Sequence, residues 1–371
     1  MAIFILIAII FYVGWRGRQA FDRYIPRRWG TAVYWVVYLL IATSYIVVDR
    51  MNLPVGSAVK SAAVWVGPYT IAFMFYAFWV LLLIDILRLL DWKLKFIPSV
   101  LKQNRAWVGA AAILLILGIL GYGTWNARNP VVTSYQLQIP KTVSGDKQLH
   151  AVVLSDLHLG RIIDRERLEH IIAQVNKLNP DIVLLAGDVI DGDARPYIEQ
   201  DMGSVFRQLQ PRLGTYMVLG NHDNMRNDDT IKVIQDSGII LLRDQYRLID
   251  NRFYLVGRNY PSRGFVPGPQ PKLASVMAGI DRQLPIIMLK HNPQDLEEAR
   301  TNQVDLQISG HTHQGQLYPL HLITERMYEI DWGHLQKDGF QLIVSTGVGT
   351  WGPPIRVGNT PEIVDLRIEF N

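Results

Sequence analysis

The feature that most constrains this chain is a set of long apolar stretches in its first third. They cover residues 2–15, 31–48, 68–84 and 107–125. A helix crosses the hydrocarbon core of a bilayer with about 20 residues, within a range of about 17 to 25. The last three stretches meet this length. The first is short, but no basic segment precedes it and no small-residue cleavage site follows it, so we interpret it as a retained helix. We therefore predict an all-α transmembrane domain with four helices over residues 1–130.

A bundle of buried soluble helices is the alternative interpretation of these stretches. Aromatic residues near their ends, such as Trp79, Trp107 and Trp125, are typical of membrane interfaces and favour the bilayer. Asp85 and Arg88 are spaced to pair with each other on one helix and to reach the interface. We expect this pair to anchor the third helix.

The charges divide the chain in the same place. Through Pro130 there are 13 Lys and Arg against 4 Asp and Glu, and from Val131 onward there are 24 against 29. The basic character therefore belongs to the apolar part, where cations face lipid headgroups, and nucleic acid is not an expected partner. Cysteine is absent, so the chain has no disulfide framework.

The basic residues also predict an orientation. Five arginines lie between the first two apolar stretches, and Lys93, Lys95, Lys102 and Arg105 lie in the segment before the last one, whereas the middle connection has only Arg50 and Lys60. Because basic loops remain in the cytoplasm, the N-terminus and everything after the fourth helix are expected outside. The prediction is a multi-pass protein of the inner or plasma membrane with a periplasmic or extracellular C-terminal domain.

Residues 131–371 have the pattern of an α/β domain. Apolar runs at 150–155 and 181–186 read as strands, and Asp164 can cap a helix between them that ends before Pro180. Alternating strands and helices of this kind predict an α/β fold. The further strands expected are 215–219, 239–242, 253–256, 285–289, 304–308, 341–344 and 363–368.

Five polar clusters follow the predicted strands. They are Asp156 with His158, Asp188 with Asp191, residues 220–223, His291 with Asn292, and residues 310–313. One such cluster would be an ordinary capped loop, but five in succession indicate a shared metal site. On an extended backbone residues two apart point the same way, which predicts that Asp156 and His158 converge, as do His311 and His313. Carboxylate, imidazole and amide donors without thiolates suit Mn, Fe or Zn.

The ordered motifs Asp-x-His, Gly-Asp-x-x-Asp, Gly-Asn-His-Asp, His and Gly-His-Thr-His resemble those of the calcineurin-like metallophosphoesterase superfamily. The resemblance begins near Leu149 and continues to the end of the chain, where the tail is similar to a membrane-linked branch. It implies a four-layer α/β/β/α sandwich that holds two divalent metal ions. In this branch Gly usually follows the last motif, whereas this chain has Gln314, and an often acidic position is occupied by Arg258 and Asn259.

The resemblance also implies a role for each motif residue. Asp188 would bridge the two ions, His222 would contact the substrate phosphate and assist the leaving group, and Asp191 would orient His222. Two ions about 3.5 to 4 Å apart can activate a water to hydroxide and clamp the attacking and leaving oxygens. The first ion would be bound by Asp156, His158 and His313, and the second by Asn221, His291 and His311.

These features predict a phosphohydrolase that acts on a lipid-linked or membrane-proximal phosphoester or pyrophosphate. A UDP-2,3-diacylglucosamine-type diphosphatase is an alternative, although an outward-facing domain weighs against a cytoplasmic nucleotide substrate. A catalytically silent metal-binding receptor is a second alternative. The loop 260–271, with Arg258 and Arg263 nearby, is either an ordinary exposed loop or a contact for a lipid headgroup.

Overall fold

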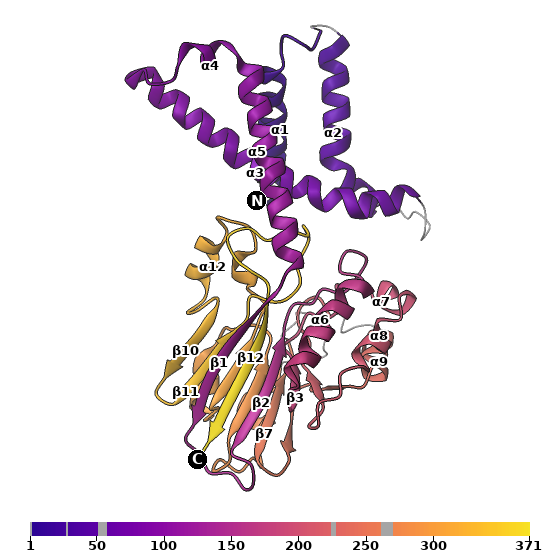
Figure 1. The fold of residues 1–371 in the computed structure, drawn as a ribbon, viewed down its shortest axis with the longest axis vertical. Helices are drawn as coiled ribbons and strands as arrows, with labels where there is room; N and C mark the ends of the chain where they lie inside the picture. The colour runs from indigo at the N-terminus through magenta and orange to yellow at the C-terminus, as the bar shows by residue number, and fades with distance from the viewer. Residues whose placement is uncertain (1, 27–28, 51–57, 224–227, 261–269) are drawn as a thin grey trace. The chain divides into compact units, whose positions relative to one another are not determined.

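The computed structural model describes residues 2–26, 29–50, 58–223, 228–260 and 270–371. The chain folds into two compact units. The first unit comprises residues 1–125 with 352–355, and the second comprises residues 126–351 with 356–371. The predicted combination of an apolar helical part and a mixed α/β part is confirmed (Figure 1).

The helical unit contains two helices that are long and apolar enough to cross a membrane, judged by length and composition. They are Ala62–Leu94 and Arg105–Arg128, and only 28% and 22% of their most apolar segments are buried. The apolar helix Trp29–Ser44 in the described region is shorter. The helices of the first part of the chain are α1 (Ala2–Ala20), α2 (Trp29–Arg50), α3 (Ala58–Leu94), α4 (Ser99–Gln103) and α5 (Arg105–Arg128).

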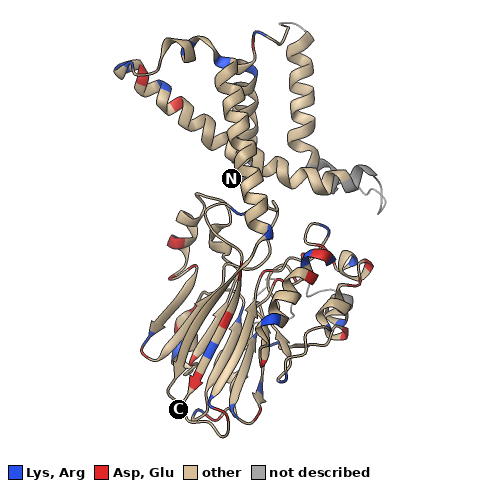
Figure 2. Cartoon of the chain, viewed as in Figure 1, with Lys and Arg blue, Asp and Glu red and all other residues tan. Residues whose placement is uncertain are grey.

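Asp85 has different partners from the one predicted. Its carboxylate forms an ion pair with Arg16 and accepts a hydrogen bond of 2.7 Å from the hydroxyl of Tyr12. The prediction of a pair with Arg88 on the same helix is wrong, because α1 packs beside α3 and supplies both partners. Figure 2 shows the charged residues of α3, α4 and the start of α5 gathered at the helix ends, with a largely uncharged stretch between.

The second unit contains two six-stranded mixed sheets. The first has the order β1-β12-β2-β3-β4-β5 and the second the order β10-β11-β9-β8-β7-β6. In both sheets the central strands run parallel, so their carboxyl ends lie at one edge. The first sheet comprises β1 (Val131–Ile139), β12 (Glu362–Phe370), β2 (Gln148–Leu154), β3 (Ile182–Leu185), β4 (Thr215–Met217) and β5 (Ile239–Leu241). The second comprises β10 (Gly333–Lys337), β11 (Phe340–Val344), β9 (Leu306–Ser309), β8 (Ile286–Lys290), β7 (Phe253–Arg258) and β6 (Gln245–Ile249).

The second unit also contains helices, several of which pack against these sheets. They are α6 (Arg165–Leu178), α7 (Arg195–Glu199), α8 (Met202–Phe206), α9 (Asp228–Asp236), α10 (Leu273–Val276), α11 (Leu296–Thr301) and α12 (His321–Met327). Figure 1 shows α6 to α9 together beside β3. The predicted helix start is confirmed at α6, where the carboxylate of Asp164 accepts a hydrogen bond of 3.1 Å from the backbone N–H of Arg167.

Three apolar cores hold the second unit together. One face of β2, with Val152 and Leu154, packs against α6 and α8, while Ala151 and Val153 on the other face belong to a core shared by both sheets. A third core joins the second sheet to α10 and α11. Because β2 is buried on both faces, its residues 151–154 form a continuous apolar run. Burial on both faces fixes the position of its carboxyl end, where the polar clusters begin.

Candidate metal centre

The five polar clusters lie at the carboxyl ends of central strands in both sheets. Asp156 and His158 follow β2, Asp188 follows β3, and residues 220–223 follow β4. His291 follows β8, and residues 310–313 follow β9. Distances of 3 to 4 Å connect side chains from the two sheets, so the two carboxyl edges build one site.

One donor group consists of Asp156, His158 and His313. Nε2 of His313 lies 3.3 Å from Oδ1 of Asp156 and 3.1 Å from Nε2 of His158. All three residues are buried, and their ligand atoms lie within 4.8 Å of one another. The structure therefore brings together the three residues predicted to bind the first ion.

A second donor group consists of Asp188, His291 and His311. Nε2 of His291 lies 3.2 Å from Oδ2 of Asp188, 3.3 Å from Nδ1 of His311 and 3.2 Å from Oδ1 of Asn221. The same carboxylate oxygen of Asp188 lies 3.8 Å from Nε2 of His158 in the first group. Asp188 thus lies between the two groups, in the position expected of a bridging ligand.

His222 lies beside these groups and contacts Asp191. Nδ1 of His222 is 2.8 Å from Oδ1 of Asp191, and the same oxygen is 3.5 Å from Nδ1 of His158. The backbone N–H of His222 donates to Oδ1 of Asp188 at 2.7 Å. Burial opposes protonation of His222, but the neighbouring carboxylates, first among them Asp191, raise its pKa above the ordinary value.

The backbone at the ligands is not extended, which corrects the geometry that we expected from the sequence. Asp156, His158, His311 and His313 all have positive φ, between 48° and 73°. A left-handed backbone is costly for residues with a side chain and concentrates at functional sites. The paired ligands therefore converge through tight left-handed turns after the strands.

Glycines permit the close packing around these ligands. A Cβ atom on Gly220 would lie 2.1 Å from Oδ1 of Asp188, and one on Gly310 would lie 1.8 Å from Oγ of Ser155. Both distances are far below van der Waals contact. Both positions therefore require glycine, because the backbone at Gly220 lies directly against Asp188 and the backbone at Gly310 lies directly against Ser155 and Asp156.

Two buried residues support the ligands in ways that the sequence did not reveal. The carboxylate of Asp223 accepts hydrogen bonds from the backbone N–H groups of Asp188, Ile190 and Gly220 at 2.8 to 2.9 Å. Arg356 is fully buried, and its guanidinium donates to the carbonyls of Thr346 and Gly349 and lies 3.3 Å from Nδ1 of His313. Asp223 stood in the Gly-Asn-His-Asp motif without an assigned role.

The donor chemistry fits divalent cations. Burial disfavours charge on His291, but Asp188 and Asp156 raise its pKa to about 10, so a proton neutralises the carboxylates when no ion is bound. Burial is the largest cause that lowers the pKa of His311 and of His313 to about 4, which keeps these rings neutral and able to ligate. Nδ1 of His291 donates to the carbonyl of Ala186 at 2.7 Å, so Nε2 is the nitrogen that faces the other donors and would bind an ion after losing its proton. A cation bound there would compete with the proton on His291.

Arg258 does not have the predicted surface position. It is buried, and its guanidinium pairs with Asp244 at 2.6 Å. It is therefore not available for a lipid headgroup, because its charge is already compensated inside the fold. Arg263 lies outside the described residues.

The sequence is similar to those of known metallophosphoesterases. A family profile described as calcineurin-like phosphoesterase matches residues 149–315. The chain is 29% identical over 271 residues to the transmembrane protein with metallophosphoesterase domain of Danio rerio, a match that covers 69% of this chain and 62% of that protein. It is 31% identical over 245 residues to an uncharacterized metallophosphoesterase of Aquifex aeolicus, covering 64% of this chain and 91% of that protein.

Two solved structures are similar at low identity. The protein TT1561 of Thermus thermophilus has 13% identity and a TM-score of 0.36, covering 56% of this chain and 91% of that one. A dimetal phosphatase from Danio rerio has 16% identity and a TM-score of 0.34, covering 55% and 88%.

The strand-end donors define the class of the second unit, a mixed α/β protein with a candidate centre for divalent metal ions. With the match to the family profile and to the Aquifex aeolicus relative, the chain belongs to the calcineurin-like metallophosphoesterase family.

Proposed function

We propose that this protein is a membrane-bound, metal-dependent phosphoesterase that hydrolyses a phosphoester or pyrophosphate bond with two divalent ions, Mn, Fe or Zn. The observation that carries the proposal is the position of Asp188 between the two donor groups. Its Oδ2 atom lies 3.2 Å from Nε2 of His291 in one group and 3.8 Å from Nε2 of His158 in the other. Two such groups around one carboxylate suit a pair of ions.

In this proposal the side chains of the site have separate roles in metal binding and in proton transfer. Bound ions would supply positive charge to the phosphate and make the attacking water more acidic. His222 would donate a proton to the leaving oxygen from the ring nitrogen that does not face Asp191, and Asp191 would fix its tautomer and orientation. The metal ligands would be Asp156, His158 and His313 for one ion, Asn221, His291 and His311 for the other, and Asp188 for both.

The membrane part of the proposal rests on apolar surface. Large apolar side chains of α3 and α5 are exposed, such as Leu89 at 69% and Leu114 at 69%, and such a surface is stable in lipid but not in water. We propose a four-helix transmembrane domain over residues 1–130 and a catalytic domain over residues 131–371. The catalytic domain would be a four-layer α/β/β/α sandwich, supported by the three apolar cores.

The substrate would be a lipid-linked or membrane-proximal phosphate, with the catalytic domain on the periplasmic or extracellular side. A UDP-2,3-diacylglucosamine-type diphosphatase is the alternative if the domain faces the cytoplasm. A silent metal-binding receptor is a weaker alternative, because His222 and Asp191 are hydrogen-bonded beside the donor groups and a receptor has no need of them.

The test is turnover by the full-length protein, stripped of metal with a chelator and then supplied with Mn, Fe or Zn. The panel would contain lipid phosphates, lipid pyrophosphates, UDP-2,3-diacylglucosamine and aryl phosphodiesters. We expect metal-dependent hydrolysis of a lipid-linked substrate. Stoichiometric metal binding without turnover of any substrate would favour the receptor instead.

A further inference from the structure

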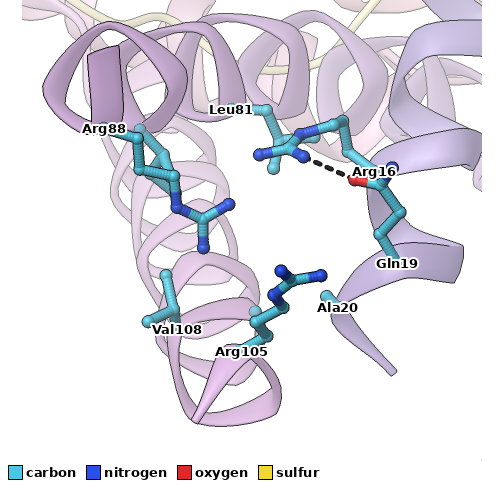
Figure 3. Close-up of a pocket in the computed structure, with 9 residues that line it drawn as sticks. Arg16, Gln19, Ala20, Leu81, Arg88, Arg105 and Val108 are labelled. Carbon is cyan, nitrogen blue, oxygen red and sulfur yellow. Dashed lines mark hydrogen bonds between the residues drawn. The ribbon is translucent and has the colours of Figure 1, made fainter. Parts of the chain in front are cut away.

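Three arginine side chains from three helices converge on a small cavity in the helical unit. Arg16 belongs to α1, Arg88 to α3 and Arg105 to α5, and all three line the cavity. Figure 3 shows their guanidinium groups turned toward one shared space. The cavity measures about 30 Å³, more than the roughly 10 to 15 Å³ that a single water requires. We call this cavity the arginine pocket.

The positive charge of the arginine pocket is only partly compensated. Asp85 pairs with Arg16, and Nη1 of Arg16 also donates to Oε1 of Gln19 at 2.5 Å. Among the described residues, Arg88 and Arg105 have no ion pair or side-chain hydrogen bond, and Nε of Arg16 has no partner. Neither Arg88 nor Arg105 is therefore paired with a carboxylate in this part of the chain, and Asp85, whose charge acts on Arg88, is already paired with Arg16.

The packing keeps these charges close together. Apart from Gln19, the rest of the pocket wall is apolar and includes Leu81, Ile84 and Val108, which lowers the local dielectric and strengthens repulsion between the arginines. Gly109 allows α5 to approach the end of α1, since a Cβ atom there would lie 2.9 Å from Cβ of Ala20. An anion between the arginines would remove the repulsion that this packing creates.

We propose that the arginine pocket binds a phosphate group, held by Arg88 and Arg105 with Arg16 beside them. Planar guanidinium groups match phosphate oxygens with paired hydrogen bonds, better than lysine does. The group is either the headgroup of an anionic phospholipid or free phosphate. The pocket forms at the helix ends that the loop charges place in the cytoplasm, where anionic lipids are abundant. The lipid source depends on the membrane insertion proposed above, whereas the free-phosphate source does not.

The experiment uses the full-length protein in nanodiscs of phosphatidylcholine alone or of equal parts phosphatidylcholine and phosphatidylglycerol. Native mass spectrometry measures retained phosphatidylglycerol, and thermal stability in phosphatidylcholine nanodiscs measures binding of inorganic phosphate. The variants are Arg88→Gln and Arg105→Gln. The control is Lys93→Gln, which removes the same charge from an exposed position on α3 outside the pocket. Circular dichroism checks that each variant is folded.

We expect the wild type and Lys93→Gln to bind one of the two probes, and each arginine variant to bind it about tenfold more weakly, the typical effect of losing a hydrogen bond to a charged group. Arginine-dependent retention of phosphatidylglycerol identifies a lipid headgroup site, and an arginine-dependent response only to inorganic phosphate identifies a free-anion site. Equal losses in Lys93→Gln and the arginine variants, or no loss in any variant, overturn the proposal. Neither readout involves hydrolysis, so the result is independent of the phosphoesterase assignment.

Discussion

Asp188 is the residue on which the two donor groups depend most. Asp188→Asn keeps the shape of the side chain but removes its negative charge between two proposed cations. We expect the metal content to fall and turnover to decrease by more than about 100-fold, because the loss of a direct ligand should exceed the roughly 10- to 100-fold effect of residues that only orient ligands. Metal analysis and turnover of the purified full-length variant would measure this. Asp193→Asn is the matched control, because Asp193 is in the same loop but pairs with Arg195.

Near-normal turnover by Asp188→Asn with full metal occupancy would contradict the assignment of a bridging ligand. A loss of activity in Asp193→Asn of similar size would show that the loop, and not the bridging charge, is responsible.

A change at His222 tests the chemical step separately from metal binding. Its imidazole is held by Asp191 at 2.8 Å and is not part of either proposed ligand set. We expect His222→Ala to keep both metals and to lose about 10² to 10⁴ in rate, as expected for a positioned acid. The defect should shrink with aryl phosphates, whose leaving groups need little protonation. His170→Ala, at an exposed position on α6, is the control.

If His222→Ala loses metal in proportion to activity, His222 is a ligand and its proposed role is wrong. If it loses neither metal nor activity, His222 takes no part in the reaction.

Residue types explain which parts of the site the sequence could reveal. His311 and His313 stand in a short motif directly after an apolar run, so their position at a strand end could be predicted. Arg356 could not be found in this way, because its partners are mostly backbone carbonyls of a loop, including those of Thr346 and Gly349. Carbonyl positions depend on the folded loop and leave no pattern in side-chain types.

Hydrogen bonds connect Asn126, in the last turn of α5, to the loop that carries His313. The side-chain amide of Asn126 donates to the carbonyls of Arg356 and Asn359 at 3.0 and 2.7 Å. The amide of Asn359 in turn donates to the carbonyl of Gln314, next to His313, at 3.2 Å. A change at Asn126 should therefore reach a proposed metal ligand through two hydrogen bonds.

We expect Asn126→Ala to weaken metal binding by about 10-fold, the lower end of the effect reported for residues that orient metal ligands. Titration of the metal-stripped full-length variant would measure it, and excess metal should restore turnover, which it would not do for a globally unfolded protein. Asn176→Ala is the control, because Asn176 also donates to a carbonyl but at an exposed position on α6. Equal metal affinity in wild type and Asn126→Ala would refute the link.

The predicted strands show a similar division between buried and exposed elements. β2, β3 and β8 are buried on both faces and are visible as apolar runs. The edge strands β6 and β10 were missed, because their residues are largely polar and, apart from Ile249, at least partly exposed. β1 was missed for the same reason at its amino-terminal half, where most side chains face solvent.

For the whole molecule, the uneven charge of the connections predicts which side of the membrane each part occupies. The sequence has no cysteine, so single cysteines report on one position each. We expect Lys177→Cys in the α/β unit to react with an impermeant thiol reagent in intact cells. Lys95→Cys in the helical unit should react only after the cells are permeabilised. Both side chains are exposed, so a lack of reaction reflects the side of the membrane and not burial.

The reverse labelling pattern would place the metal centre in the cytoplasm, where nucleotide-activated lipids are made. It would remove the main argument against a UDP-2,3-diacylglucosamine-type substrate, and it would place the arginine pocket at the outer surface of the membrane. The expected pattern would instead argue against a UDP-2,3-diacylglucosamine-type substrate. An outward-facing metal centre can reach only phosphates that have crossed the membrane or are displayed on its outer leaflet. Labelling of both positions in intact cells would instead show that the charges of these loops do not determine a single topology.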